Sequence, residues 1–400
     1  MAARLGDAYP GNVERSLEAG ESMKTLLVVS AKIPSLPYAE RKQIEAAGQH
    51  PRASLLEETI NADVIDNQYL CDFQSRSKFT WLISKVLPPP FLQALIAYWM
   101  RRRYDVVVSY DDRFALIYAF LLRVTRSRSR HVAIIATIEP LMKAFLVKLF
   151  QKGIDRIILW SQTQRDLLVE FFDISRARII VLPYYVDHEF FRSTEGATDY
   201  IFSAGDSRRD YGTLIEAMRG LNIRCIIHTR NMLVEGVDSE LTRRNLAGVS
   251  SIPNNVVFRA ESTLIGLRAM YEHSRFVVVP LFPTFKNVGL SVITEAMAMG
   301  KAIICSHIQG QTEFVRDGVT GLFVPPCNAQ ALRDAIEYLW DHPELAEHMG
   351  REGRRTAEKV FSLTQFAANV RQIVDDVITG SQTAIPSIAE QMRALSKSEP

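Results

Sequence analysis

The sequence predicts an α/β protein with two domains, each built on a parallel β-sheet. Its 400 residues exceed what one hydrophobic core usually supports. Short apolar runs rich in β-branched residues alternate with helical stretches, which is the pattern of a parallel sheet with crossover helices. The alternation begins near residue 25 and begins again near residue 200, so we expect one sheet in each half of the chain.

In the first half, apolar runs predict strands, and two amphipathic stretches between them predict helices. Strands are expected at 25–30, 62–66, 104–109, 131–137, 155–161 and 177–183, with helices at 114–123 and 162–172. Residues 1–22 contain four acidic side chains and no apolar core, so we expect a disordered tail rather than a secretory signal.

The second half repeats this pattern. Strands are expected at 200–204, 224–228, 255–258, 275–280 and 302–305, with a turn into a further strand at 318–325. Helices are expected at 212–219, 264–273, 328–341, 343–360 and 364–379. We expect domains at 23–190 and 197–362, a linker at 186–198, and a helix at 363–379 that crosses back to the first domain. Residues 380–400 are rich in Ser, Gln, Pro and Lys, which predicts a disordered tail.

The composition is that of an ordinary soluble protein, with 47% hydrophobic and 23% charged residues. Its four cysteines lie far apart and indicate a reducing compartment, so we expect a cytoplasmic protein. We find no apolar run of about 18 residues that could span a membrane. Residues 76–156 carry 15 Lys and Arg against 5 Asp and Glu, a balance of +10, which indicates an anionic partner.

The most informative segment is 288–304, with the sequence VGLSVITEAMAMGKAII. It predicts a Gly-containing loop, a helix ended by Gly300 and a buried strand. The start of such a helix directs free N–H groups and a positive dipole end toward a phosphate. Glu295 lies further into the helix, where a carboxylate can accept hydrogen bonds from ribose hydroxyls. This combination predicts a nucleotide site; the alternative is an ordinary loop–helix–strand unit with a solvated Glu295.

Other motifs accompany this segment in order along the chain: PYYVD at 183–187, SAGDSRRDY at 203–211, GQTEFV at 310–315, DGVTGL at 317–322 and VP at 324–325. Together with residues 289–301, they resemble the motifs of retaining family-4 glycosyltransferases of the GT-B fold (glycosyl transferases group 1). The resemblance covers roughly residues 24–378 and is specific in the second half. It implies two Rossmann-like domains that face each other across a cleft, the first binding the acceptor and the second the nucleotide-sugar.

The resemblance also implies which residues bind the donor. The family uses two glutamates eight positions apart; the second corresponds to Glu295, whereas Asn287 stands at the first position and carries no charge. The loops that would hold the donor contribute Gly205, Gly289, Leu290 and Ser291.

Two further positions would act near the reacting bond. Arg208 and Arg209 stand where the family has a basic pair on the donor diphosphate, and the planar guanidinium suits phosphate oxygens. The alternative is a solvated pair in a loop. Glu139 stands where the family often has a histidine near the transferred sugar; the alternative is a surface carboxylate.

The implied activity is a hexosyltransferase-type transfer from a nucleotide-sugar to an acceptor hydroxyl, with retention, in polysaccharide, glycolipid or other glycoconjugate synthesis. Negative charge grows on the leaving nucleoside diphosphate, and the two arginines and the amides at 289–291 would stabilise it. Two alternatives remain open. One is a nucleotide-sugar epimerase of related fold, for which we see no acid/base set; the other is a non-catalytic partner that kept the fold, which Asn287 makes conceivable.

We expect no metal and no other cofactor. Enzymes of the GT-B fold generally work without a bound metal, and the eight histidines show no zinc-site spacing. Asp111 and Asp112 follow an expected strand end, but further ligands at suitable spacing are missing.

Residues 78–103 combine aromatic and aliphatic side chains with a basic cluster. Trp81 and Trp99 lie on either side of three prolines, which exclude one continuous helix, and Arg101, Arg102 and Arg103 follow. Such a segment is typical of a membrane or acceptor face, so we expect peripheral attachment to the inner face of an anionic membrane and consider a lipid-linked acceptor. The alternative is that these side chains cover the first sheet. We see no nucleic-acid-binding module.

Overall fold

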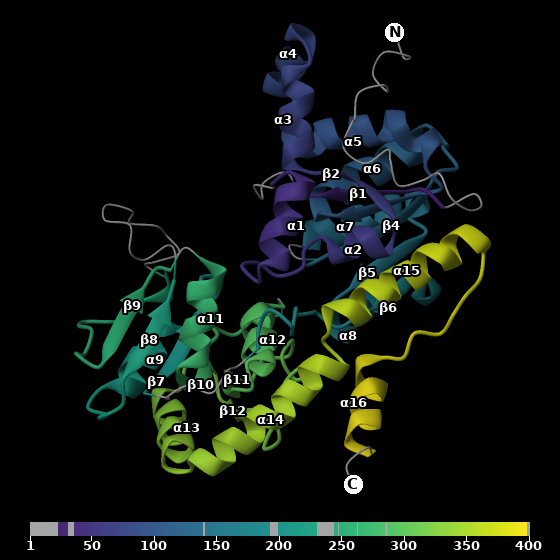
Figure 1. Ribbon diagram of the computed structural model, residues 1–400. Helices are drawn as coiled ribbons and strands as arrows, with labels where there is room; N and C mark the ends of the chain where they lie inside the picture. Colours follow the sequence, from purple (N-terminus) through teal and green to yellow (C-terminus); the bar gives the residue numbers. More distant parts are fainter. Residues whose placement is uncertain are drawn as a thin grey trace. The chain divides into compact units, whose positions relative to one another are not determined.

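The computed structural model describes residues 23–30, 36–138, 141–192, 199–229, 244–246, 248–261, 263–284 and 287–397. The chain divides into two compact units (Figure 1). Unit 1 comprises Met1–Ala46, Ala53–Val181 and Ala367–Ile385, and unit 2 comprises Ala47–Arg52, Leu182–Phe366 and Pro386–Pro400. Each unit holds one six-stranded parallel sheet, which confirms the predicted α/β class.

The sheet of unit 1 has the order β2-β1-β3-β4-β5-β6, and all neighbouring strands are parallel. Its strands are β1 (Thr25–Val29), β2 (Ala62–Ile65), β3 (Val106–Tyr110), β4 (Arg130–Ile134), β5 (Arg156–Leu159) and β6 (Ile179–Val181). Each matches a predicted run. The central strands β1 and β3 bury four of their five residues, because helices cover both faces of the sheet.

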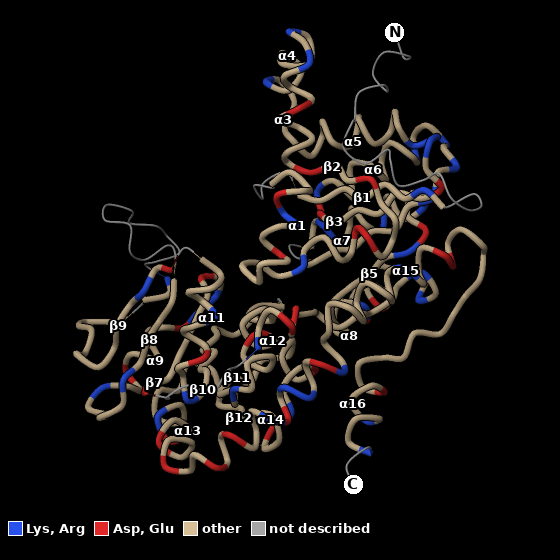
Figure 2. Tube along the Cα trace, viewed as in Figure 1, with Lys and Arg blue, Asp and Glu red and all other residues tan. Residues whose placement is uncertain are grey.

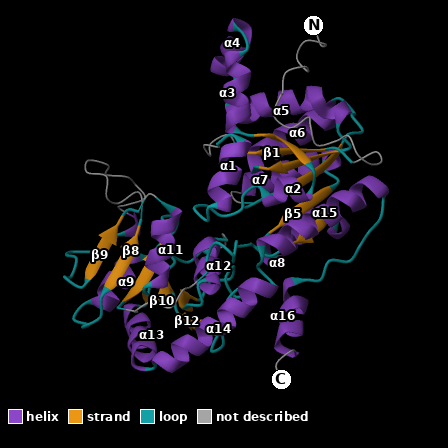
Figure 3. Cartoon of the chain, in the orientation of Figure 1, coloured by secondary structure: helices purple, strands orange, loops and turns teal. Residues whose placement is uncertain are grey.

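The helices of unit 1 are α1 (Tyr38–Ala46), α2 (Leu55–Thr59), α3 (Asn67–Ser75), α4 (Lys78–Val86), α5 (Pro89–Met100), α6 (Asp112–Val124), α7 (Leu141–Phe150) and α8 (Gln162–Phe172), with short 3₁₀ turns η3 (Arg101–Arg103), η4 (Gln151–Gly153) and η5 (Arg176–Arg178). The crossovers from β2 through β6 all run in one direction across the sheet. Right-handed crossovers therefore place α5, α6, α7 and α8 in one layer, where each packs against the next (Figure 3).

The prolines at 88–90 separate two helices, as predicted. Ser77 and Thr80 form a capping box that starts α4, which ends at Val86. Pro89 and Pro90 then occupy the first turn of α5, where a missing N–H costs nothing.

The sheet of unit 2 has the order β12-β11-β10-β7-β8-β9 and is also parallel throughout. Its strands are β7 (Tyr200–Ala204), β8 (Cys225–His228), β9 (Val256–Arg259), β10 (Ser274–Val279), β11 (Ala302–Ser306) and β12 (Gly321–Val324). Its helices include α9 (Tyr211–Met218), α11 (Leu264–Glu272), α12 (Leu290–Ala298), α13 (Ala329–Asp341) and α14 (Pro343–Lys359). Gly300 ends α12 at φ +67, the left-handed cap predicted for it.

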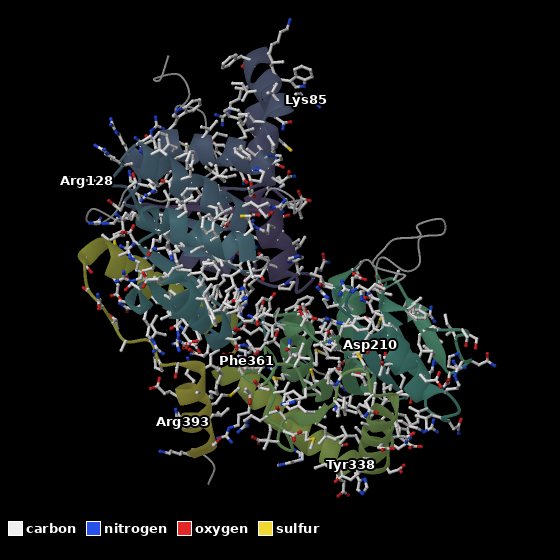
Figure 4. All side chains as sticks on the ribbon, turned by 180° about the vertical axis from the view of Figure 1, so that it is seen from behind. Lys85, Arg128, Asp210, Tyr338, Phe361 and Arg393 are labelled. Atoms are coloured by element: carbon white, nitrogen blue, oxygen red, sulfur yellow. The ribbon has the colours of Figure 1, made fainter. Side chains whose placement is uncertain are left out.

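Residues 186–192 are not the linker that we expected. Val186 pairs with the chain after α14: its N–H donates to Phe361 O (2.8 Å; Phe361 is labelled in Figure 4), and its carbonyl accepts from Leu363 N (3.0 Å). Phe190 and Phe191 are buried. The residues next to these two phenylalanines are polar, so the composition of the segment predicted a linker. Residues 193–198 lie outside the described residues.

The predicted disorder of residues 380–400 is wrong for the helix α16 (Ile388–Lys397). Ile388 and Leu395 are buried, and α16 packs against α14, where Arg316 Nη1 donates to Ser396 Oγ (3.0 Å). Two apolar side chains seven residues apart on one helical face are enough to hold α16 in place, although the segment as a whole is polar. The preceding helix α15 (Leu363–Thr379) begins in unit 2 and belongs to unit 1 from Ala367 onward. Residues 1–22 lie outside the described residues.

Candidate functional site

The sheet of unit 2 reverses its direction of growth between two neighbouring strands. From β7 the chain continues outward through β8 and β9, and it then returns to the other side of β7 to form β10. In open α/β sheets, ligands bind beyond the carboxyl ends of the strands at such a point. The loops after β7 and β10 are those that contain the predicted donor residues.

Backbone hydrogen bonds join these two loops. Arg209 and Leu281 form an antiparallel bridge, Asp210 N donates to Pro280 O (3.0 Å), and Phe282 N donates to Arg208 O (3.1 Å). Asp210, labelled in Figure 4, also caps α9 by accepting from Thr213 N (3.0 Å). The loop after β7 is therefore fixed against the segment that leads to α12.

Arg209 is buried at the centre of this arrangement. Its Nε donates to Ala204 O (2.7 Å) and its Nη1 to Ser207 O (3.0 Å). Two glycines lie against the guanidinium: a Cβ on Gly205 would come within 2.9 Å of Arg209 Cζ, and one on Gly289 within 3.6 Å of Arg209 Nη1. Gly205, Arg209 and Gly289 thus form one cluster.

Replacing Gly205 with alanine should displace Arg209. The residue has φ +102, which strains any side chain, and the new Cβ would collide with the guanidinium. Gly220→Ala is the matched control, because Gly220 also has a positive φ (+79) but has open space around it. Its free energy of unfolding should fall only by the cost of the left-handed backbone, roughly 1 kcal/mol. We expect a larger loss of Tm and weaker nucleoside diphosphate binding for Gly205→Ala; equal losses in both variants would contradict a displaced Arg209.

No side chain from the described residues caps the start of α12. Gly289 occupies the N-cap position at φ +83 and offers no side-chain acceptor for the first-turn N–H groups. Leu290 is buried and Ser291 is exposed, so these residues contribute mainly their backbone N–H groups to the site. Together with the helix dipole, these groups favour an anion next to Arg209.

Glu295 accepts a hydrogen bond from the hydroxyl of fully buried Tyr271 (Oη–Oε2 2.8 Å). Protein surrounds the carboxyl group, although the residue keeps some exposed surface. This desolvation raises the pKa of Glu295 to about 7, and it outweighs the Tyr271 hydrogen bond and the positive charge of Arg209, which both favour the carboxylate. Sequence reasoning missed Tyr271, because no local pattern marks a tyrosine at the end of α11 as a partner of α12.

Buried amide groups next to α12 have unused hydrogen-bonding capacity. Within the described residues, neither the Oδ1 nor the Nδ2 of Asn287 has a partner. Fully buried Gln311 donates from Nε2 to Val288 O, and its Oε1 has no partner in the same part of the chain. Such groups are costly unless a ligand or water satisfies them. Asn287 and Gln311 are therefore candidates for direct ligand contact, and Gln311 belongs to a motif to which sequence reasoning gave no role.

Arg208 differs from Arg209 in its burial, its backbone conformation and its side-chain contacts. It is partly exposed and has φ +56, a left-handed conformation that is costly for arginine. Its side chain has no hydrogen-bond or ion-pair partner among the residues that the structure describes. Backbone strain of this kind often accompanies a functional role.

The aspartates of unit 1 that the sequence brought into question make structural contacts. Glu139 lies outside the described residues. Asp111 caps α6, accepting from Arg113 N (2.9 Å) and Phe114 N (3.1 Å), and Asp112 pairs with Lys143 Nζ (2.6 Å). Neither acts in a metal cluster: across the described ranges, no three His, Cys, Asp or Glu side chains gather in a way that could hold a metal.

The predicted membrane or acceptor face lies on the surface of unit 1. Trp81 and Trp99 are 53% and 59% exposed, so neither covers the sheet. Arg101 stacks on Tyr98 (Cζ to ring centroid 3.6 Å), and Arg102 and Arg103 are exposed. No helix in the described part of the chain has the length and apolarity to cross a membrane.

Comparison with known protein families finds a match within unit 2. Residues 192–356 match the model of the family described as glycosyl transferases group 1. Unit 2 is therefore similar to this family over most of its length. The match contains every predicted donor residue from Gly205 to Glu295, and it confirms the group 1 resemblance that the sequence motifs predicted.

Individual relatives of this chain are also glycosyltransferases by name. It is 36% identical over 95 residues to D-rhamnosyltransferase WbpZ of Pseudomonas aeruginosa, a stretch that spans 24% of this chain and a quarter (25%) of that relative. It is 23% identical over 375 residues to MMP alpha-(1->4)-mannosyltransferase of Mycolicibacterium hassiacum, covering 87% of this chain and 85% of the relative. The structure of Anabaena HepE in complex with UDP-glucose superposes with a TM-score of 0.60 at 16% identity, over 90% of this chain and all (100%) of HepE. This likeness confirms the GT-B fold.

Proposed function

We propose that the protein transfers a glycosyl group from a nucleotide-sugar donor to an acceptor hydroxyl in glycoconjugate synthesis. The observation that carries this proposal is the convergence of Arg209, the uncapped start of α12 and Glu295 beyond β7 and β10, in a unit that matches the group 1 family. The UDP-glucose bound to HepE supports a nucleotide-sugar donor. WbpZ and the Mycolicibacterium mannosyltransferase support sugar transfer as the reaction.

The chemistry follows from where charge develops. When the bond between the sugar and the diphosphate breaks, negative charge grows on the leaving group. Arg209 is held by Ala204 O and Ser207 O before the donor arrives, so it stabilises this charge without reorganising. The N–H groups at the start of α12 and the side chain of Arg208 add to this stabilisation. Glu295 accepts from the ribose hydroxyls, and by family resemblance the configuration of the sugar is retained.

Unit 1 binds the acceptor in this proposal. Glu139 would contact the acceptor or the transferred sugar. The exposed Trp81 and Trp99 and the basic residues 101–103 would attach the protein peripherally to an anionic membrane that presents a lipid-linked acceptor.

A panel of nucleotide-sugars tests the proposed donor site. A true donor present at a hundredfold excess over its Kd should stabilise the protein by about 2.7 kcal/mol, which is measured as a rise in Tm. Glu347→Gln, on the exposed face of α14, should respond like the wild type. Failure of every nucleotide-sugar and nucleoside diphosphate to raise Tm would contradict the proposed function.

Transfer should survive EDTA. Charge on the leaving diphosphate is neutralised by Arg208, Arg209 and helix N–H groups in this proposal, so a divalent cation has no required role. The measurement is donor consumption before and after chelation. Loss of activity that magnesium or manganese restores would contradict the metal-free reaction.

A further inference from the structure

The outer face of the helical layer in unit 1 is apolar to an unusual degree. We use outer face for the solvent side of α5, α6 and α7 together with that of α4, which contacts α5. Twelve of the seventeen exposed large apolar side chains in the described part of the chain belong to these four helices: Phe79, Trp81, Leu82, Val86, Phe91, Trp99, Phe120, Val124, Leu141, Met142, Phe145 and Leu149. Such a concentration on one layer marks an interaction surface rather than scattered exposure.

Helix α7 shows this most clearly, because it is apolar on both sides. Ala144 and Val147 face the core of unit 1, and the opposite side carries four large apolar side chains in helical spacing: Leu141, Met142, Phe145 and Leu149. A helix with large apolar side chains on two opposite sides is normally covered on both of them. The solvent side of α7 therefore needs an apolar partner.

A pocket of about 270 Å³ lies at the carboxyl end of this helix. Phe145 and Leu149 form its apolar wall, and Arg123, Lys148 and Lys152 supply three cations. The three cations are exposed, and within the described residues their side chains form no ion pair or hydrogen bond. By contrast, Lys143 on the same helix is neutralised by Asp112. Unpaired cations beside an apolar wall suit an amphiphilic anion.

The position of the pocket separates it from the substrate machinery. Arg123 lies in the last turn of α6, shortly before β4, and Lys152 lies in η4, shortly before β5. The pocket is therefore at the amino ends of the strands, whereas substrates of such sheets bind beyond the carboxyl ends.

Further positive charge surrounds this end of the layer. Arg101 Nε donates to Ser127 Oγ (3.2 Å), which joins the basic turn η3 to the arginines that follow α6. Figure 2 shows Lys and Arg gathered where α5 and α6 end, and Figure 4 shows Arg128 with its side chain pointing outward. The apolar outer face thus has a cationic border, the arrangement that complements an anionic bilayer.

We propose that the pocket of Arg123, Lys148 and Lys152 binds the phosphate headgroup of an anionic phospholipid while the exposed side of α7 enters the acyl region. This site deepens the membrane attachment included in the proposed function and rests on it. It extends the membrane face from residues 81–103 to α6, α7 and η4.

Vesicle co-sedimentation at low salt tests the site, using phosphatidylcholine vesicles with and without phosphatidylglycerol. Wild-type protein should bind the anionic vesicles more tightly than the neutral ones. Lys148→Gln/Lys152→Gln should bind the anionic vesicles roughly thirtyfold more weakly, since each cation at such a surface contributes about 1 kcal/mol. Lys359→Gln/Lys397→Gln removes the same charge from exposed positions of unit 2 and should bind like the wild type. Phe145→Ser should weaken binding without changing the charge.

A soluble probe distinguishes a headgroup pocket from diffuse attraction. Monomeric dihexanoyl phosphatidylglycerol should bind the wild type saturably in calorimetry and should not bind Lys148→Gln/Lys152→Gln, and inorganic phosphate should bind much more weakly because it lacks acyl chains. Undiminished vesicle binding by that variant would overturn the pocket but leave membrane attachment intact. If the wild-type protein does not bind anionic vesicles, both the pocket and the membrane attachment are overturned. An unchanged rise in Tm with nucleotide-sugar would then show that the proposed donor site is unaffected.

Discussion

Replacing Glu295 with glutamine should stabilise the folded protein at pH 8 and, at the same time, weaken nucleotide-sugar binding about tenfold or more. The folded structure raises the pKa of Glu295 from 4.5 to about 7. Between these values the unfolded carboxyl has lost its proton and the folded one still holds it, so stability falls as pH rises from 4.5 to 7 and stays reduced above 7. The penalty reaches at most about 3 kcal/mol. Glutamine removes this penalty and still accepts the hydrogen bond from Tyr271.

The loss of donor affinity has a separate cause. A hydrogen bond to a charged group is worth about 1.5–3 kcal/mol, and the ribose hydroxyls would lose the carboxylate. Thermal unfolding at pH 8 and pH 4 and donor titration at pH 8 measure the two effects. At pH 4 the stabilisation should vanish, because the carboxyl is protonated in both states. Unchanged donor affinity in Glu295→Gln would remove Glu295 from the proposed donor site. Glu347→Gln, on the exposed face of α14, is the matched control.

Arg208 and Arg209 should respond to substitution with opposite changes in stability. Arg208→Gly relieves the left-handed backbone at φ +56, so stability should rise by up to about 1 kcal/mol. Arg209→Ala removes the donors to Ala204 O and Ser207 O and the positive charge near Glu295, so stability should fall.

Both arginine variants should bind nucleoside diphosphate about tenfold or more weakly, because each guanidinium contributes a charge-assisted hydrogen bond to phosphate. Affinity for the nucleoside alone should change little. Calorimetric titration with the two ligands, together with thermal unfolding, measures this. Equal losses for nucleoside and diphosphate would show that these side chains do not touch phosphate, and a destabilised Arg208→Gly would show that its backbone is not strained.

Elements with strong local patterns could be predicted from the sequence. The strands β1 and β3 are continuous apolar runs, and α12 is bounded by Gly289 and Gly300, so each element encodes its own boundaries. The helix α16 and the packed segment 186–192 could not be predicted in this way. Each is held by two apolar anchors within a polar stretch, and the surfaces that receive these anchors come from distant parts of the chain.

By itself, the sequence determined the two-sheet α/β class, the group 1 motifs and the residue types of the proposed donor site, because these depend on residue order and short-range periodicity. Only the tertiary structure decided how those residues differ. It buried Arg209 between two glycines and left Arg208 strained and partly exposed. It placed Tyr271 on Glu295, and it gathered three unpaired cations beside the apolar side of α7. The physical reason is that desolvation, close approach and charge pairing depend on neighbours that are distant along the chain, and the packing of strands and helices determines which neighbours meet.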